Sequence, residues 1–103
     1  MTTTWIKADL ASAIPLGKIK EYKINNIHIA IAHSQNQFFA FSALCTHAQC
    51  PLAAGQLDQD QITCPCHGSK FNLKTGEVLA LPAVTSLKIY LLKVENNTIF
   101  VGL

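Results

Sequence analysis

Charged side chains are scarce in this 103-residue sequence, where they make up 14% of the residues against about 25% in a typical soluble domain. No stretch reaches the roughly 18 consecutive apolar residues that a membrane span needs, and no charged start leads into the apolar run of a signal peptide. The net charge of only +2, without a basic cluster interleaved with aromatics, argues against a nucleic-acid partner. We therefore expect one cytoplasmic, monomeric domain over residues 1–103.

The low charge has two explanations that the sequence leaves open. Half of the residues are hydrophobic, so a small β-rich protein could cover its solvated faces with Thr, Ser, Asn and Gln instead of charged groups. Alternatively, part of the surface is an apolar patch that docks onto another protein.

Hydrophobic periodicity predicts strands rather than helices. Apolar residues alternate with a period of two in the strongest segments, and polar turns separate them. The expected strands cover residues 5–7, 19–24, 27–32, 37–41, 87–94 and 98–101. Apart from one helical turn near Asp9, no helix is expected, and Trp5, Phe38, Phe39 and Phe41 are assigned to the core. The fold class is therefore all-β, a small antiparallel sandwich or barrel.

The region from about residue 43 to 82 has dense turn signals and only brief strands, which in a small β domain indicates a functional site. It contains two short motifs. The first begins Cys45-Thr46-His47 and ends at Cys50-Pro51, and the second is Cys64-Pro65-Cys66-His67-Gly68-Ser69. Each motif pairs a thiol with an imidazole at close spacing, which predicts a mixed-ligand metal site. His28 and His33 lie away from the motifs and are expected to be ordinary sheet or surface residues.

Cys-x-His, sixteen intervening residues and then Cys-x-x-His closely resemble the Rieske family. The resemblance implies one [2Fe–2S] cluster per chain, held by Cys45 and Cys64 on one iron and His47 and His67 on the other. Neutral imidazoles in place of two thiolates make the site less negative, so Rieske potentials run from about −150 to +300 mV against about −400 mV for plant-type ferredoxins.

The resemblance covers most of the chain and has two sides. Residues 71–78 and 81–84 are similar to the ferredoxins of ring-hydroxylating dioxygenases and to small subunits of nitrite reductases, in which the segment around Pro82 forms a third loop over the cluster. The two motifs are instead similar to the high-potential Rieske proteins of cytochrome bc complexes. The chain is thus expected to combine a small ferredoxin body, with its cluster-binding subdomain, and high-potential loops.

The high-potential likeness implies roles for residues around the ligands. Cys50 and Cys66 match a disulfide that joins the two loops, although two buried thiols are the alternative for a cytosolic protein. Ser69 matches a serine that donates a hydrogen bond to a cluster sulfide and raises the potential, unless it is simply a turn residue. Phe71 stands where those proteins carry a tyrosine, so that donor is missing. Gly68 is expected to let the backbone approach the cluster, or only to form a turn.

The expected function is electron transfer without catalysis, between a reductase and an oxygenase or other redox protein. A first alternative is a small electron-transfer subunit of a larger oxidoreductase of the nitrite or arsenite type. A second is a structural zinc module with two Cys and two His, although the Cys-x-His opening is unlike the usual Cys-x₂₋₄-Cys start of such sites.

Overall fold

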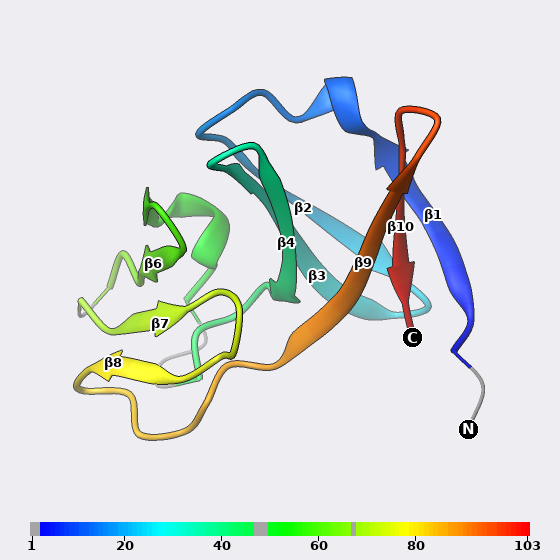
Figure 1. Cartoon of the computed structure of the whole chain (residues 1–103). Coiled ribbons are helices and arrows are strands. Elements are labelled where there is room, and N and C mark those ends of the chain that lie inside the picture. Colours follow the sequence, from blue (N-terminus) through cyan, green and yellow to red (C-terminus); the bar gives the residue numbers. More distant parts are fainter. Residues whose placement is uncertain (1–2, 47–49, 67) are drawn as a thin grey trace.

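The computed structural model describes residues 3–46, 50–66 and 68–103. In these ranges the regular elements are β-strands and two single turns of 3₁₀ helix (Figure 1). In chain order they are β1 (Trp5–Leu10), η1 (Ala11–Ala13), β2 (Ile19–Ile24), β3 (Ile27–Ser34), β4 (Gln37–Ser42), η2 (Leu52–Ala54), β5 (Gln56–Asp58), β6 (Gln61–Thr63), β7 (Lys70–Asn72), β8 (Val78–Ala80), β9 (Ile89–Glu95) and β10 (Thr98–Gly102).

Six long strands form one antiparallel sheet in the order β1-β10-β9-β4-β3-β2. Its three hairpins turn on two residues each, Asn25-Asn26, Gln35-Asn36 and Asn96-Asn97, and all six have positive φ. This backbone is that of the tight hairpin turn whose twist matches the strands, and asparagine tolerates it better than most residues.

The central hairpin of β3 and β4 is buried on both faces. Ile29 and Ile31 point into a first core inside the six-stranded sheet, whereas Ala30 and Ala32 face a second core shared with residues 43–87. The period of two expected for residues 27–32 is present, and both alanines of this strand are buried. Small side chains are needed there because a second layer packs directly on it.

The second layer is a four-stranded antiparallel sheet in the order β5-β6-β7-β8. It lies beside the larger sheet in Figure 1, with the loops that carry the two Cys-His motifs at its end. Its strands are only three residues long, so the subdomain depends on the second core and on loop contacts for its shape.

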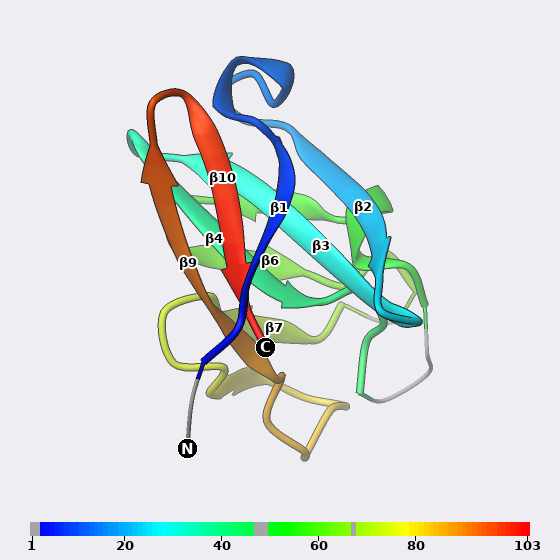
Figure 2. The same cartoon turned by 90° about the vertical axis from the view of Figure 1, so that its right-hand side faces the viewer.

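The edges of the large sheet, β1 and β2, curl toward one another (Figure 2). The Tyr22 hydroxyl on β2 donates a 2.6 Å hydrogen bond to the Asp9 carboxylate on β1, across this seam. The bond lowers the pKa of Asp9, and burial together with that bond raises the pKa of Tyr22. The sheet is therefore a nearly closed barrel, fastened by a side-chain bond where no backbone ladder joins the two edges.

The all-β fold predicted from the sequence is confirmed, with each expected strand present. The last long strand begins at Ile89 rather than at Leu87, and the single helical turn lies at Ala11–Ala13, just after the expected position. Assigning Trp5 to the core was wrong: it is 38% exposed on the outer face of β1, and the Lys93 ammonium lies 4.6 Å from its ring centroid. No helix among the described residues is long and apolar enough to cross a bilayer.

Replacing Tyr22 by Phe is expected to lower the melting temperature by a few degrees at pH 7, because the seam loses its hydrogen bond. Folding lowers the pKa of Asp9, so this stabilisation is present above the unfolded-state pKa and is lost as the pH falls through the folded-state pKa. Thermal melts of both proteins from pH 7 down to acid should therefore converge. A constant difference across that range would contradict the role of the Asp9 carboxylate.

Candidate metal centre

Two similar backbone turns hold the sequence motifs. In ligand loop one, residues 45–50, the Cys45 N–H donates to the Cys50 carbonyl at 2.9 Å. In ligand loop two, residues 64–69, the Cys64 N–H donates to the Ser69 carbonyl at 2.7 Å. Each turn thus closes between a predicted ligand cysteine and the residue five positions later, so both cysteines lie at the bases of their loops.

The two predicted thiol ligands are buried in the same core. Cys45 is 1% exposed and Cys64 is 2% exposed, and both pack in the cluster that covers the alanine face of β3. The two predicted imidazole ligands, His47 and His67, lie outside the described residues. The structure therefore places both thiols in the second core, while the complete four-ligand set stays a prediction.

The other two cysteines join the ligand loops covalently, as the family resemblance implied. Cys50 and Cys66 form a disulfide with their Cα atoms 6.4 Å apart. Cys66 is exposed and Cys50 is half-buried, so the bridge lies on the outer side of the loops while the ligand thiols face inward. The disulfide holds the two thiol-bearing turns at a set separation.

A third loop, residues 81–87, is bonded to both ligand loops. The Ala83 N–H donates to the buried Ser69 hydroxyl oxygen at 3.0 Å, and the Thr46 hydroxyl donates to the Thr85 carbonyl at 2.7 Å. Because the Ser69 oxygen accepts from Ala83, its own proton is left for another acceptor. This geometry suits the predicted donation to a sulfide, and it places Pro82 next to the ligand loops.

Two further predicted positions are explained in different ways. Phe71, on β7, is fully buried and contributes a hydrocarbon surface with no donor. Gly68 has a φ of +80° and is exposed, and a Cβ built on it would meet no atom within 4 Å among those described. Its positive φ favours glycine there, and the approach of its backbone to the cluster stays a prediction.

The two hydrogen bonds that attach the third loop to the ligand loops were not predicted from the sequence. Thr46 stands between two predicted ligands, a position that could have marked it. Thr85 and Ala83 had no such signal, because their contribution is a backbone carbonyl and a backbone amide. As expected, His33 is remote from the site: its Nδ1 lies 2.8 Å from the Ile14 carbonyl, and its ring stacks on Phe38.

The described residues fit an iron–sulfur cluster. Two thiols are shielded from water on loops that a disulfide and a third loop hold together, and one buried hydroxyl retains a proton to donate. Thiolates are the ligands that such clusters take from proteins.

Residues 4–91 match the protein family described as the Rieske [2Fe-2S] domain. The chain belongs to this family. The match spans both sheets, so the membership predicted from the two motifs is confirmed over the larger part of the Rieske fold and not only at the loops.

The individual relatives include both kinds of protein that the sequence resembles, dioxygenase ferredoxins and Rieske proteins of cytochrome complexes. The chain is 34% identical over 96 residues to the ferredoxin component of the naphthalene 1,2-dioxygenase/salicylate 5-hydroxylase systems of Ralstonia sp., covering 93% of this chain and 92% of the relative. It is 36% identical over 92 residues to the cytochrome b6-f complex iron-sulfur subunit of Chlorobaculum thiosulfatiphilum, covering 89% of this chain but 50% of that protein.

The fold also matches a solved electron-transfer assembly. A chain in the complex of reduced oxygenase and oxidised ferredoxin in carbazole 1,9a-dioxygenase superposes with a TM-score of 0.87 at 32% identity, covering 94% of this chain and 91% of that chain. The likeness to the ferredoxin component therefore covers nearly the whole length of both proteins.

Replacing both disulfide cysteines of this Rieske protein, Cys50→Ala with Cys66→Ala, is expected to destabilise the subdomain by about 3 kcal/mol. The closed loop spans 16 residues, and opening it frees the unfolded chain. Urea unfolding followed by the visible absorbance of the bound cofactor measures this. Intact mass after alkylation without reductant is the control, and two reactive thiols in the wild-type holoprotein would contradict the bridge.

Proposed function

We propose that this chain carries one Rieske [2Fe–2S] cluster, bound by Cys45, Cys64, His47 and His67. In this role it passes single electrons from a reductase to the terminal oxygenase of a ring-hydroxylating dioxygenase system. The observation that carries the proposal is the pair of buried thiols on loops joined by a disulfide, in a chain that resembles ferredoxin components over nearly its whole length. We propose the role of carrier, with catalysis left to the partner.

When bound, the cluster accepts and returns one electron. The protein's part is to set how readily this happens and where. Burial of Cys45 and Cys64 lowers the local dielectric, so the charge of the added electron is weakly screened and nearby donors act strongly on it. The disulfide and the third loop hold the ligand turns in place, which limits rearrangement between the two oxidation states.

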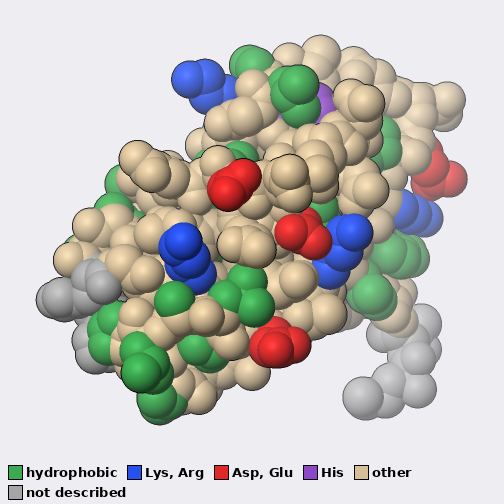
Figure 3. Space-filling view, turned by 60° about the vertical axis from the view of Figure 1, so that its left-hand side comes forward, with side chains coloured by type: hydrophobic (Ala, Val, Ile, Leu, Met, Phe, Trp, Pro, Cys, Tyr) green, Lys and Arg blue, Asp and Glu red, His purple; other side chains and the backbone are tan. Residues whose placement is uncertain are grey.

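The third loop also provides a docking surface. Leu81 and Val84 are 73% and 83% exposed, the two highest values among the large exposed hydrophobic residues of the described chain. Figure 3 shows hydrophobic side chains gathered at the lower end of the face that carries the small sheet. Apolar side chains beside the ligand loops favour contact with another protein, which supports the docking explanation of the low charge.

The decisive experiment combines spectroscopy with electron transfer. The purified holoprotein should be coloured, contain two irons per chain and give a low-temperature EPR signal after reduction, all of which Cys45→Ser or Cys64→Ser should abolish. The reduced protein should then be mixed by stopped flow with the oxygenases of naphthalene 1,2-dioxygenase, biphenyl 2,3-dioxygenase and carbazole 1,9a-dioxygenase. At least one of these oxygenases should oxidise the protein.

The outcomes of this experiment separate the competing functions. A colourless protein with bound zinc would contradict the cluster. A coloured protein that reduces none of the three oxygenases would contradict the carrier role toward this class of partner. Stable co-purification with a larger oxidoreductase would favour the subunit alternative instead.

The reduction potential should respond to the side chain at position 69. Ser69→Ala removes a buried donor, so the potential should fall by roughly 60 mV, equivalent for one electron to about 1.4 kcal/mol. Phe71→Tyr should raise it, because the new hydroxyl brings a donor into a fully buried position. Direct electrochemistry on the three holoproteins measures both shifts.

A matched control addresses the loss of the third-loop contact in Ser69→Ala. Thr46→Val also detaches the third loop, but its hydroxyl is already committed to the Thr85 carbonyl. It should therefore leave the potential nearly unchanged. An equal fall in Thr46→Val and Ser69→Ala would assign the effect to loop position and overturn the role of the Ser69 hydroxyl.

A further inference from the structure

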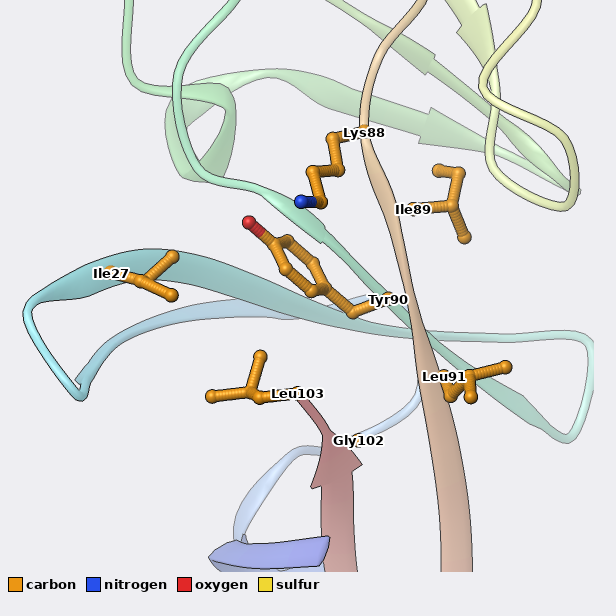
Figure 4. Close-up of a pocket in the computed structure, with 7 residues that line it drawn as sticks. All are labelled: Ile27, Lys88, Ile89, Tyr90, Leu91, Gly102 and Leu103. Carbon is orange, nitrogen blue, oxygen red and sulfur yellow. The ribbon is translucent and has the colours of Figure 1, made fainter. Parts of the chain in front are cut away.

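A groove of about 270 Å³ opens between the start of β9, the first residue of β3, and the last residues of the chain (Figure 4). Its walls are mostly aliphatic, with Ile27, Leu91 and Leu103 among them. Ile27 and Leu91 are 37% and 58% exposed, so this apolar surface lacks a covering element among the described residues.

The polar side chains of the groove are both hydrogen-bond donors. The ammonium of Lys88 lies 5.3 Å from the ring centroid of Tyr90, and Figure 4 shows it next to the Tyr90 hydroxyl on one wall. Burial raises the pKa of Tyr90, so that hydroxyl keeps its proton. Within the described part of the chain, Lys88 forms no ion pair. An ammonium and a phenol together, without a neighbouring carboxylate side chain in the lining, complement an anion.

The end of the chain does not neutralise this wall through a described contact. An oxygen of the Leu103 carboxyl group accepts a 3.1 Å hydrogen bond from the Thr4 N–H, which ties the last residue to the residue before β1. Its side chain contributes to the apolar lining. The groove therefore combines a hydrocarbon surface with a wall that carries the Lys88 ammonium.

The groove is joined to the segment that leads into ligand loop one. The Ser42 N–H donates to the Lys88 carbonyl at 2.9 Å, and the Ala43 N–H donates to the His28 carbonyl at 3.1 Å. Ala43 is two residues before Cys45, a separation of at most about 7 Å along the chain. A protein that covers the ligand loops would therefore also reach the groove.

From this juxtaposition we infer that the groove takes an acidic side chain of the redox partner, with its apolar neighbours, and so sets the orientation in which that partner docks. The inference rests on the proposed function and extends it. Leu81 and Val84 of the third loop provide apolar contact that carries little directional information. A charged contact at Lys88 adds a second point of attachment, which restricts rotation about the apolar contact and favours one docking pose.

The test uses whichever oxygenase of the three the wild-type holoprotein reduces fastest. Lys88→Glu should lower the second-order rate of electron transfer about tenfold at low ionic strength, with the difference shrinking as salt is added. Leu91→Gln, an exposed apolar position of the same groove, should lower the rate without that salt dependence. An unchanged EPR signal and reduction potential would show that each variant is folded and loaded.

Lys7→Glu is the matched control. Lys7 is an exposed lysine on β1 outside the groove lining, and its substitution changes the net charge by the same amount as Lys88→Glu. It should alter the rate by less than Lys88→Glu at every salt concentration. Equal effects would assign the change to the overall field and overturn the inference, as would a Lys88→Glu protein with wild-type kinetics.

Two other results would also decide the matter. If Lys88→Glu changes the sedimentation behaviour of the protein alone, the groove binds a second copy of the chain and the inference is wrong. If the wild-type holoprotein reduces no oxygenase, the proposed function fails and the inference falls with it. If the wild-type protein and the Lys88→Glu variant transfer electrons equally fast, only the inference about the groove is contradicted and the proposed function stands.

Discussion

The burial of the β3–β4 hairpin on both faces is the constraint on which the rest of the structure depends. Ile29 and Ile31 fill the barrel, while Ala30 and Ala32 present a nearly flat surface to the other side. That flat surface lets Cys45, Cys64 and Phe71 pack against the barrel as part of one core. Larger residues on the alanine face would push the subdomain away and open the thiols to water.

The loops shield their buried thiols from water on one side and are accessible to a partner protein on the other. Inward, the predicted ligand thiols are buried, and the Ser69 hydroxyl is bonded to the third loop. Outward, the disulfide reaches the surface, and the third loop exposes leucine and valine side chains. An electron carrier needs both conditions, because a wet site weakens the control of potential and a deeply covered one lies too far from its acceptor.

The features that resemble high-potential Rieske proteins lie in the loops, apart from the large sheet. The disulfide and the buried serine belong to the loops alone, and the large sheet does not contact them through any described side-chain hydrogen bond. Loop chemistry and body can therefore vary separately. We attribute partner choice to surfaces around the loops and the setting of potential to their interior.

The sequence by itself determined the fold class and the placement of the expected strands through local period, and the family through spacing within two short motifs. Through the family resemblance it implied the disulfide, but it left two buried thiols as the alternative. The sequence could not show whether the alanines of β3 are solvated or buried, because a small residue is compatible both with a solvated face and with a face under a second layer. Trp5 was misplaced for a related reason: a large aromatic on an outer face, covered by a lysine, has the same sequence signature as a core residue. The seam bond from Tyr22 to Asp9, the two ties of the third loop and the groove at Lys88 were decided only by tertiary structure, because each joins segments 13 or more residues apart whose meeting depends on the curl of the sheet and the packing of its two layers.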